Sequence, residues 1–369
     1  MLFFRKISHF FSLNAHILIQ FIVLNVFSIF SQAQILPLVL NRAESTDVKI
    51  PLEWENRLFS ATYIQKLIIK EVNFYFIVDC WHHRVLFLQR DNPLDSHALE
   101  TLSKTTSNQG FSLSEWQTLD AVNLFGPHSL ATDGKFLVID NTGVHSLNLY
   151  EPTQLLNGQW HFQLVKTISD IGFRPHRTHF DESLKKFVVV SSGDNSIYNF
   201  DIQGQLLKIN LPTKKLAYIR SMTILKNGNY AFTSGDSEIL ITDNKGNRVN
   251  SYSVLPQFAS MNDIFELDHE RGFIISTTPQ RLIFTPSLQE FSKGNYVDLF
   301  NQLQLKGTPY YVSYFDDRLW IPEITEYTRL IGYNLNYEES SLPINSPLIL
   351  FDFGLPSIYS FIRKVCGFL

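Results

Sequence analysis

Short apolar stretches separated by polar turns recur along the chain and predict paired β-strands. Each unit holds an apolar stretch, a turn and a second apolar stretch that ends near an aromatic residue. Such short stretches, several of them alternating apolar and polar residues, are typical of strands, and amphipathic helical patterns are scarce after residue 50. The pairs occupy residues 76–87, 136–150, 187–201, 230–244, 273–285 and 319–335.

The spacing of these pairs predicts a ring of repeated sheets. The residues that end the first strand of each pair lie 42 to 61 positions apart, at Asp79, Asp140, Ser192, Ser234, Thr277 and Pro322. A spacing of about forty residues between strand units is typical of β-propeller blades. One blade cannot bury both of its faces alone, so blades must pack against their neighbours. We therefore expect an all-β, six-bladed β-propeller over residues 50–350.

Further strands and turns are expected around the pairs. Inner strands should precede five of them, at 128–133, 176–181, 220–225, 262–267 and 310–315, and outer strands should follow four, at 115–122, 160–168, 206–211 and 248–254. Gly134, Gly228 and Gly272 mark turns. The polar segment 90–112 reads as a surface insertion. Near the end, LILFDF (348–353) is expected to complete a blade begun near residue 48, and residues 351–369 to hold the end of this strand and a short amphipathic helix.

The N-terminal segment has the layout of a secretory signal peptide. Arg5 and Lys6 precede a mostly apolar run at 17–30, and Ser31 and Ala33 form a small-residue cleavage site before Gln34. We expect removal of residues 1–33, a leader at 34–49, and export to a secreted or periplasmic location. The alternative is a membrane anchor formed by residues 17–40, although its polar SQAQ stretch and its proline disfavour a spanning helix.

Composition and charge narrow the function classes. The formal net charge is −4, becoming −6 once the two basic residues of the leader are removed, and the body has no run of Lys or Arg. A nucleic-acid partner is therefore not expected. Two cysteines exclude a disulfide framework and a structural zinc site of the four-ligand type. A bond between Cys80 and Cys366 stays open, with two unpaired thiols favoured.

The segment DCWHHRV, residues 79–85, resembles the NHL-repeat signature D-x-x-N-H-R-V. Asp79, His83, Arg84 and the following valine match, and His82 stands where Asn is usual. The match is partial at 140–147 and degenerate elsewhere. The resemblance implies a propeller blade in which the Asp and His bond across the turn and the Arg packs against the next blade. We interpret the segment as a structural turn, because adjacent histidines on an extended chain would point to opposite faces and Cys80 shows no activating base.

Two inner strands begin alike, with Pro-His. FGPHSLATD and FRPHRTHFD place His128 and His176 after a proline that fixes the backbone at the strand entry. Inner strands line the axis of a propeller, and the same register selects polar residues in the later blades. The sequence thus predicts a ligand-binding ring at the channel mouth formed by His128, His176, Arg220, Asn262, Asp263 and Tyr310.

The Pro-His starts resemble those of amidating-lyase propellers, in which histidines of several blades bind zinc on the axis. The resemblance carries over only to His128 and His176, because the register offers no third histidine and His179 is expected on the opposite face of its strand. Gluconolactonase-type propellers bind calcium with Glu, Asn and Asp of the inner strands. Asn262 and Asp263 fit such a site, but no partner Glu stands out, and Glu323 follows a second strand. Zinc and calcium both stay open.

Two classes of function compete. The favoured one is an exported, non-catalytic binding propeller that presents one end to a small molecule, a carbohydrate or a protein. The alternative is a metal-dependent lyase or lactonase-like hydrolase, in which a metal polarises a carbonyl or activates water. Whether the chain is an enzyme is left open, and a membrane partner follows only if the leader is uncleaved. Phosphate-loop, nucleophile-elbow and zincin motifs are absent from the sequence.

Overall fold

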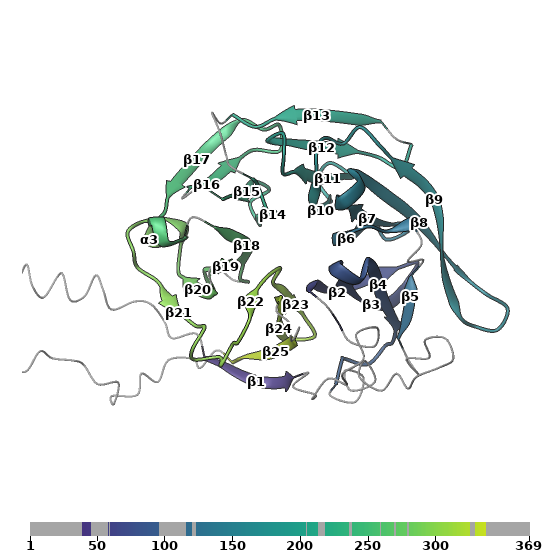
Figure 1. Cartoon of the computed structure of the whole chain (residues 1–369), viewed down its shortest axis with the longest axis horizontal. Coiled ribbons are helices and arrows are strands. Elements are labelled where there is room, and N and C mark those ends of the chain that lie inside the picture. Colours follow the sequence, from purple (N-terminus) through teal and green to yellow (C-terminus); the bar gives the residue numbers. More distant parts are fainter. Residues whose placement is uncertain are drawn as a thin grey trace, which may run out of the picture. The chain divides into compact units, whose positions relative to one another are not determined.

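The chain forms a six-bladed β-propeller, as predicted (Figure 1). The structure is a computed structural model that describes residues 39–45, 58, 60–95, 116–119, 123–203, 205–212, 218–235, 238–258, 260–268, 271–278, 280–324 and 329–336, with only the backbone described at 39–45, 329, 335 and 336. The described residues up to position 335 belong to one compact unit, and of the second unit, Asn336–Leu369, only the first residue is described. The expected signal peptide, insertion tip, LILFDF strand and C-terminal helix lie outside the described residues. Within those residues, we find no helix with the length and apolarity needed to cross a membrane.

Five sheets follow one another as consecutive antiparallel meanders, each running from an inner to an outer strand. The inner strands of four of these sheets correspond to predicted ones, and the first sheet has a further inner strand that lies before the pair at 76–87. The strands are β2 (Ala61–Ile69), β3 (Val72–Asp79), β4 (Arg84–Gln89) and β5 (Gln117–Leu119); β6 (Pro127–Thr132), β7 (Leu137–Asn141), β8 (Ser146–Gln154) and β9 (Trp160–Ile168); β10 (Pro175–Asp181), β11 (Lys186–Ser191), β12 (Ser196–Phe200) and β13 (Leu206–Asn210); β14 (Ser221–Ile224), β15 (Tyr230–Thr233), β16 (Glu238–Thr242) and β17 (Arg248–Ser253); and β18 (Met261–Glu266), β19 (Phe273–Thr277), β20 (Arg281–Thr285) and β21 (Val297–Asp298).

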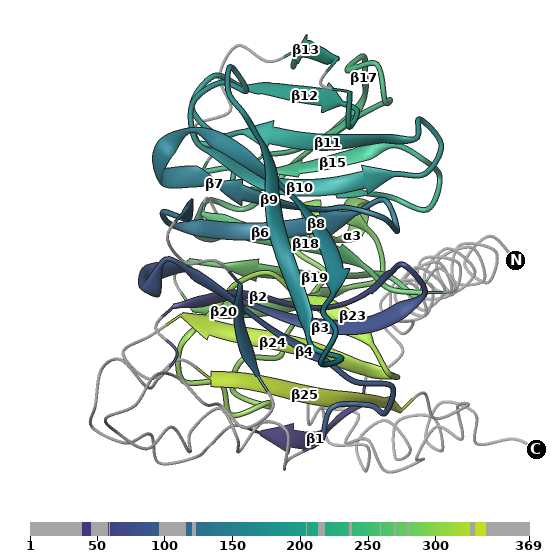
Figure 2. The same ribbon diagram turned by 90° about the vertical axis from the view of Figure 1, so that its right-hand side faces the viewer.

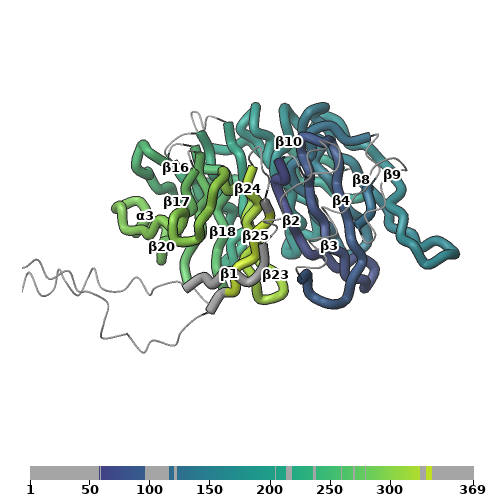
Figure 3. The backbone as a smooth tube through the Cα atoms, turned by 60° about the horizontal axis from the view of Figure 1, so that its bottom comes forward, coloured from purple at the N-terminus to yellow at the C-terminus, as the bar shows by residue number. Residues whose placement is uncertain are grey.

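The sixth sheet closes the ring. It contains β22 (Thr308–Pro309), β23 (Ser313–Phe315), β24 (Arg318–Ile324) and β25 (Arg329–Asn336), and β1 (Val39–Ser45) pairs with β25 at its outer edge (Figures 1 and 2). The expectation that the first sheet is the composite one was therefore wrong, because β2 already supplies its inner strand. Figure 3 shows β24 and β25 beside β2, where the last sheet meets the first.

The inner strand of the sixth sheet is broken rather than continuous over 310–315. The Tyr310 N–H donates to Pro322 O at 3.0 Å, whereas the Tyr311 N–H donates to Thr62 O of the first sheet at 3.2 Å. The break turns two consecutive tyrosines toward the centre of the ring. It also joins the first and last sheets by a backbone hydrogen bond.

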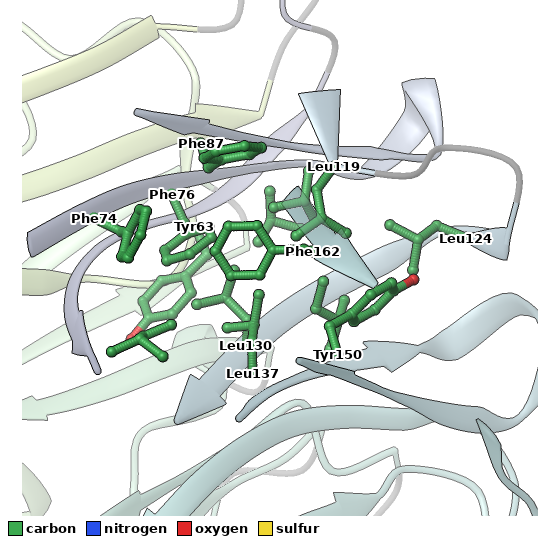
Figure 4. Close-up of a cluster of buried hydrophobic side chains, with 14 of the residues drawn as sticks. Tyr63, Phe74, Phe76, Phe87, Leu119, Leu124, Leu130, Leu137, Tyr150 and Phe162 are labelled. Atoms are coloured by element: carbon green, nitrogen blue, oxygen red, sulfur yellow. The ribbon is translucent and has the colours of Figure 1, made fainter. Parts of the chain in front are cut away.

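The apolar core lies between neighbouring sheets. Among the described residues, six buried clusters lie between consecutive sheets, including the last with the first, and the cluster between the first two sheets also contains Tyr310 and Tyr311 of the sixth. Between the first two sheets, Phe162 of β9 packs edge-on against Phe74 and Phe87, with ring centres 5.4 and 4.9 Å apart (Figure 4). The expected reason for ring formation is thereby confirmed, since each sheet buries its faces only against its neighbours.

The DCWHHRV turn has a different geometry from the one its resemblance implied. Cys80–His82 form one turn of 3-10 helix and His83 is left-handed, with φ 55°. Asp79 Oδ2 accepts from Arg84 Nε at 2.8 Å and lies 2.7 Å from His82 Nδ1. Arg84 therefore pairs inside the turn, and His83 reaches the next sheet instead, where its Nδ1 accepts from the Gly126 N–H at 3.0 Å. His82 and His83 have separate roles, as expected. The turn geometry separates them, and not the alternation of side chains along a strand.

The second sheet repeats this contact. His145, also left-handed with φ 57°, accepts from the Arg174 N–H at 3.2 Å through Nδ1. Both contacts fix the segment that enters the following inner strand. The two turns thus hold in place the starts of β6 and β10, which carry His128 and His176.

Candidate functional site

The starts of the inner strands converge at one end of the ring axis. The ring centres of His128 and His176 lie 4.2 Å apart, with 43° between the planes. The Tyr310 ring, from the sixth sheet, lies 6.3 Å from that of His128. The structure thus brings together three residues that the sequence predicted as site residues.

Burial and backbone contacts favour the neutral form of both histidines and one tautomer of each ring. His128 Nδ1 lies 2.9 Å from Gly126 O, and His176 Nδ1 lies 3.0 Å from Arg220 O. A carbonyl oxygen can only accept, so each Nδ1 carries the proton and each Nε2 keeps a lone pair. Burial lowers the pKa of His128 to about 4 and holds the pKa of His176 well below its ordinary value.

Two arginines give this end of the axis a positive charge. Arg220 Nη1 donates to Asn262 Oδ1 at 2.7 Å, and the guanidinium carbons of Arg220 and Arg174 lie 5.6 and 5.5 Å from the centre of the Tyr218 ring. That ring is 5.6 Å from His176. Within the described ranges neither arginine has a carboxylate partner, and the buried Nε of each has no hydrogen-bond partner there. Their charges also contribute to lowering the pKa values of both histidines.

Asn262 connects three sheets rather than facing an open site. Its amide nitrogen donates to Pro309 O at 3.0 Å. Its amide oxygen accepts from Arg220 and, at 3.1 Å, from Thr278 Oγ1. Asn262 therefore positions the Arg220 guanidinium, and both the oxygen and the nitrogen of the Asn262 amide are hydrogen-bonded within the protein.

Asp263 belongs to a buried network at the centre of the ring. Its carboxylate accepts from Ser221 Oγ at 2.5 Å and from the Val312 N–H at 2.8 Å, and lies 3.9 Å from Arg177 Nη2. Burial raises its pKa, which these donors and the guanidinium oppose. Asp263 thus connects its own sheet to the third, fourth and sixth sheets, which is a structural role.

Arg177 crosses toward the opposite side of the ring. Its guanidinium carbon lies 4.2 Å from the ring centres of both Tyr63 and Tyr311, between the first and last sheets. The Tyr311 hydroxyl lies 2.6 Å from His176 Nδ1 and donates to backbone carbonyl oxygens. Arg177 is only 3% exposed, and its Nε and Nη1 have no hydrogen-bond partner in the described part of the chain.

A register shift explains why adjacent residues reach the same centre. The β10–β11 pairing shifts between Pro175 and Arg177, and similar shifts occur at the starts of β2, β6 and β18. A bulge breaks the alternation of side chains and re-aims them. His176 and Arg177 can therefore both contact Tyr311 although they are neighbours on one strand.

Cys80 lies beside the histidine pair as a buried thiol. Its Sγ is 3.8 Å from both ring nitrogens of His128. Burial raises its pKa far above the ordinary value, with the nearby carboxylates of Asp140 and Asp79 adding to the effect. A thiol of this kind is protonated at neutral pH and is a poor nucleophile.

The predicted metal ligands do not assemble into a metal centre. Among the described residues, no group of three or more His, Cys, Asp or Glu side chains has the arrangement needed to hold a metal ion. His179, the suggested third histidine, donates from Nε2 to Met222 O at 2.6 Å, which ties it to the fourth sheet. Glu323 accepts from the Lys306 and Gly307 N–H groups at 2.5 Å. Both residues are thus engaged by protein groups, and among the described residues neither supplies a third ligand position beside His128 and His176.

The fold defines a six-bladed β-propeller, and the cluster of histidines and arginines at one end of its axis is the candidate site. No protein-family model matches the chain, and no curated protein does. Among solved structures, it is similar to a catalytically inactive virginiamycin B lyase from Staphylococcus aureus with quinupristin, at 10% identity over 81% of this chain and 99% of that one, with a TM-score of 0.49. It is also similar to YCF48 bound to D1 peptide (12% identity, 82% and 98% covered, TM-score 0.48) and to Kuenenia stuttgartiensis hydrazine synthase (15%, 76% and 80%, 0.46). Similarities at this level carry no argument about function.

Proposed function

We propose that this propeller is a non-catalytic binding protein that holds an anionic group of its ligand at the axial site. The observation that supports this most directly is the pair Arg174 and Arg220, whose buried Nε donors have no partner among the described residues. A buried donor without a partner is costly, and an arginine binds carboxylate or phosphate oxygens through several donors at once. An anionic ligand would satisfy these groups.

The two histidines add a second requirement. Because His128 and His176 are neutral and protonated on Nδ1, their Nε2 atoms are acceptors. They would accept from a hydroxyl or N–H group of the ligand, next to its anionic group. The class of ligand that fits is a small organic acid or phosphate that also carries a hydrogen-bond donor.

Calorimetric titration of the purified chain with glycolate and inorganic phosphate tests this proposal. The double variant Arg174→Gln/Arg220→Gln should weaken binding by at least about tenfold, because charge-assisted hydrogen bonds are lost. The control is Arg248→Gln on the outer strand β17, whose side chain is exposed and far along the chain from the site. Absence of binding to the wild type, or equal binding by the double variant, would contradict the proposal.

The metal-dependent lyase or hydrolase remains the less favoured alternative. It needs a third ligand beside His128 and His176, which the described residues do not supply. Elemental analysis of the purified chain distinguishes the two functions. Stoichiometric zinc or calcium that disappears in His128→Ala/His176→Ala would support the enzyme.

We further propose that the chain is exported, on the basis of the basic, apolar and small-residue layout of residues 1–33. N-terminal sequencing of the mature protein should then begin at Gln34. An intact Met1 on a membrane-bound protein would favour the anchor instead.

A further inference from the structure

An apolar rim surrounds part of the axial site. We define it as Trp81, Phe125, Val144 and Phe173, whose exposed fractions are 63%, 51%, 53% and 53%. Large apolar side chains exposed together on a soluble protein often mark a binding surface. This rim is therefore the strongest feature of the described surface that the proposed anion site does not yet use.

The rim lies at the same end of the propeller as the histidine pair. Ala61 at the start of β2 pairs with Asp79 at the end of β3, and the second sheet repeats this arrangement. Turns between second and third strands therefore lie at the edge where the inner strands begin. Trp81 follows Cys80, whose Sγ is 3.8 Å from the His128 ring, so the turn of the first sheet reaches the site itself.

The two phenylalanines of the rim are held rigidly by a repeated device. Phe125 stacks on His83 with ring centres 4.4 Å apart, and Phe173 packs on His145 at 4.3 Å. A glycine in the adjoining turn makes room for each ring. A Cβ added at Gly143 would lie 2.1 Å from the Phe125 ring. In the turn of the third sheet, a Cβ added at Gly193 would lie 2.3 Å from the Phe173 ring. Half-exposed rings in fixed positions form a preorganised apolar surface, which lowers the entropic cost of binding.

We propose that the ligand is an organic anion with an apolar body. Its acidic group binds Arg174 and Arg220, and its body lies on the apolar rim over the first three sheets. The two parts belong to the same strand-entry segments, because Arg174 follows Phe173 directly and Gly126 separates Phe125 from the Pro-His start by one residue. An inorganic anion would make no apolar contact with the rim. This inference rests on the proposed anion site and specifies its ligand.

A matched series of ligands tests the inference by calorimetric titration at fixed ionic strength. The series is acetate, benzoate, 2-naphthoate and the uncharged 2-naphthalenemethanol. We expect the affinity of the wild-type chain to increase by about 10- to 100-fold from acetate to 2-naphthoate, in line with the added apolar area. The alcohol should bind more weakly than 2-naphthoate, because it lacks the charge.

Variants then locate the apolar contact. Trp81→Ala and Phe173→Ala should each reduce 2-naphthoate affinity by about 2- to 10-fold, the usual range for one aromatic contact, with acetate unaffected. Leu156→Ala is the matched control, because this leucine is fully exposed between β8 and β9, away from the rim. Thermal unfolding of each variant confirms that it is folded.

The outcomes separate this inference from the proposed function. Equal affinity for acetate and 2-naphthoate, both lost in Arg174→Gln/Arg220→Gln, would overturn the apolar body and keep the anion site. Equal affinity for 2-naphthoate and 2-naphthalenemethanol, unaffected by that double variant, would overturn both. An effect of Leu156→Ala equal to that of Trp81→Ala would contradict the assigned position.

Discussion

Replacing Arg177 by methionine tests the network that supports the axial site. The guanidinium is buried between the rings of Tyr63 and Tyr311, with its carbon 4.2 Å from each centre, and its Nη2 lies 3.9 Å from Asp263. Methionine keeps much of the length and apolar volume of the side chain. The variant therefore removes the charge and leaves Asp263 as a buried carboxylate without its cation.

The expected loss of unfolding free energy is about 3–5 kcal/mol, the usual cost of breaking a buried ion pair by removing one partner. The two contacts with tyrosine rings add to this loss, and the relieved desolvation of the arginine opposes it. Arg177→Met/Asp263→Asn should recover about half of the loss by the same reasoning. Asparagine can still accept from the Val312 N–H and donate to Ser221 Oγ, so the neutral pair leaves no buried charge.

Urea unfolding at pH 7.5 and pH 5, followed by tryptophan fluorescence, measures these differences. Burial already raises the pKa of Asp263, and removal of the cation raises it further. A raised carboxyl pKa means that the folded state holds a proton which the unfolded state has lost, so acidification favours folding. The penalty of Arg177→Met should therefore be smaller at pH 5. A loss below about 1 kcal/mol, or a double variant no more stable than the single one, would refute the structural role of the pair.

Three further predictions concern other parts of the chain. Burial lowers the pKa of His128 from 6.5 to about 4, so only the unfolded chain gains a proton between these pH values, and acidification over this range should lower the unfolding free energy by up to about 3 kcal/mol. His128→Asn, whose amide can donate to Gly126 O, should reduce the dependence of the unfolding free energy on pH, as measured by urea unfolding. An unchanged pH dependence would count against the assignment. A chain that begins at residue 46 lacks β1 and exposes the edge of β25. It should show a lower melting temperature, and more association by light scattering, than a chain that begins at Gln34. Equal behaviour of the two chains would mean that β1 does not close the ring. Elemental analysis should find zinc and calcium well below one equivalent, and a stoichiometric metal that depends on His128 and His176 would contradict the described site.

The propeller could be predicted because its repeat is visible in the strand pairs themselves. Turn signals agreed with the strands: Gly272, for example, adopts φ 110°, and a Cβ there would meet Thr285 O at 2.2 Å. The closing strand could not be predicted in the same way. An outer strand makes one backbone pairing and buries little, so VLNRAES of β1 carries no stronger strand signal than LILFDF near the other terminus.

The site could be predicted only in part. The repeated Pro-His start identified His128 and His176, and these rings do meet. Arg174 and Tyr218 were missed although each lies two residues before a predicted position, a regularity that the sequence does contain. Arg177 was missed because strict alternation places it away from His176, whereas the register shift at the start of β10 brings both to Tyr311.

Hydrogen bonding separates the predicted ring into supporting and available groups. Asn262 and Asp263 are occupied by donors and acceptors from neighbouring sheets, so their polarity is explained by the assembly of the ring. Arg174 and Arg220 are not explained in this way, since each keeps a buried Nε that no described residue accepts from. Buried polar groups are normally satisfied, and those that are not point to a missing partner. The proposed anionic group would supply this acceptor, and the half-exposed rings of Phe125 and Phe173 belong to the apolar rim on which we propose that the rest of the ligand lies.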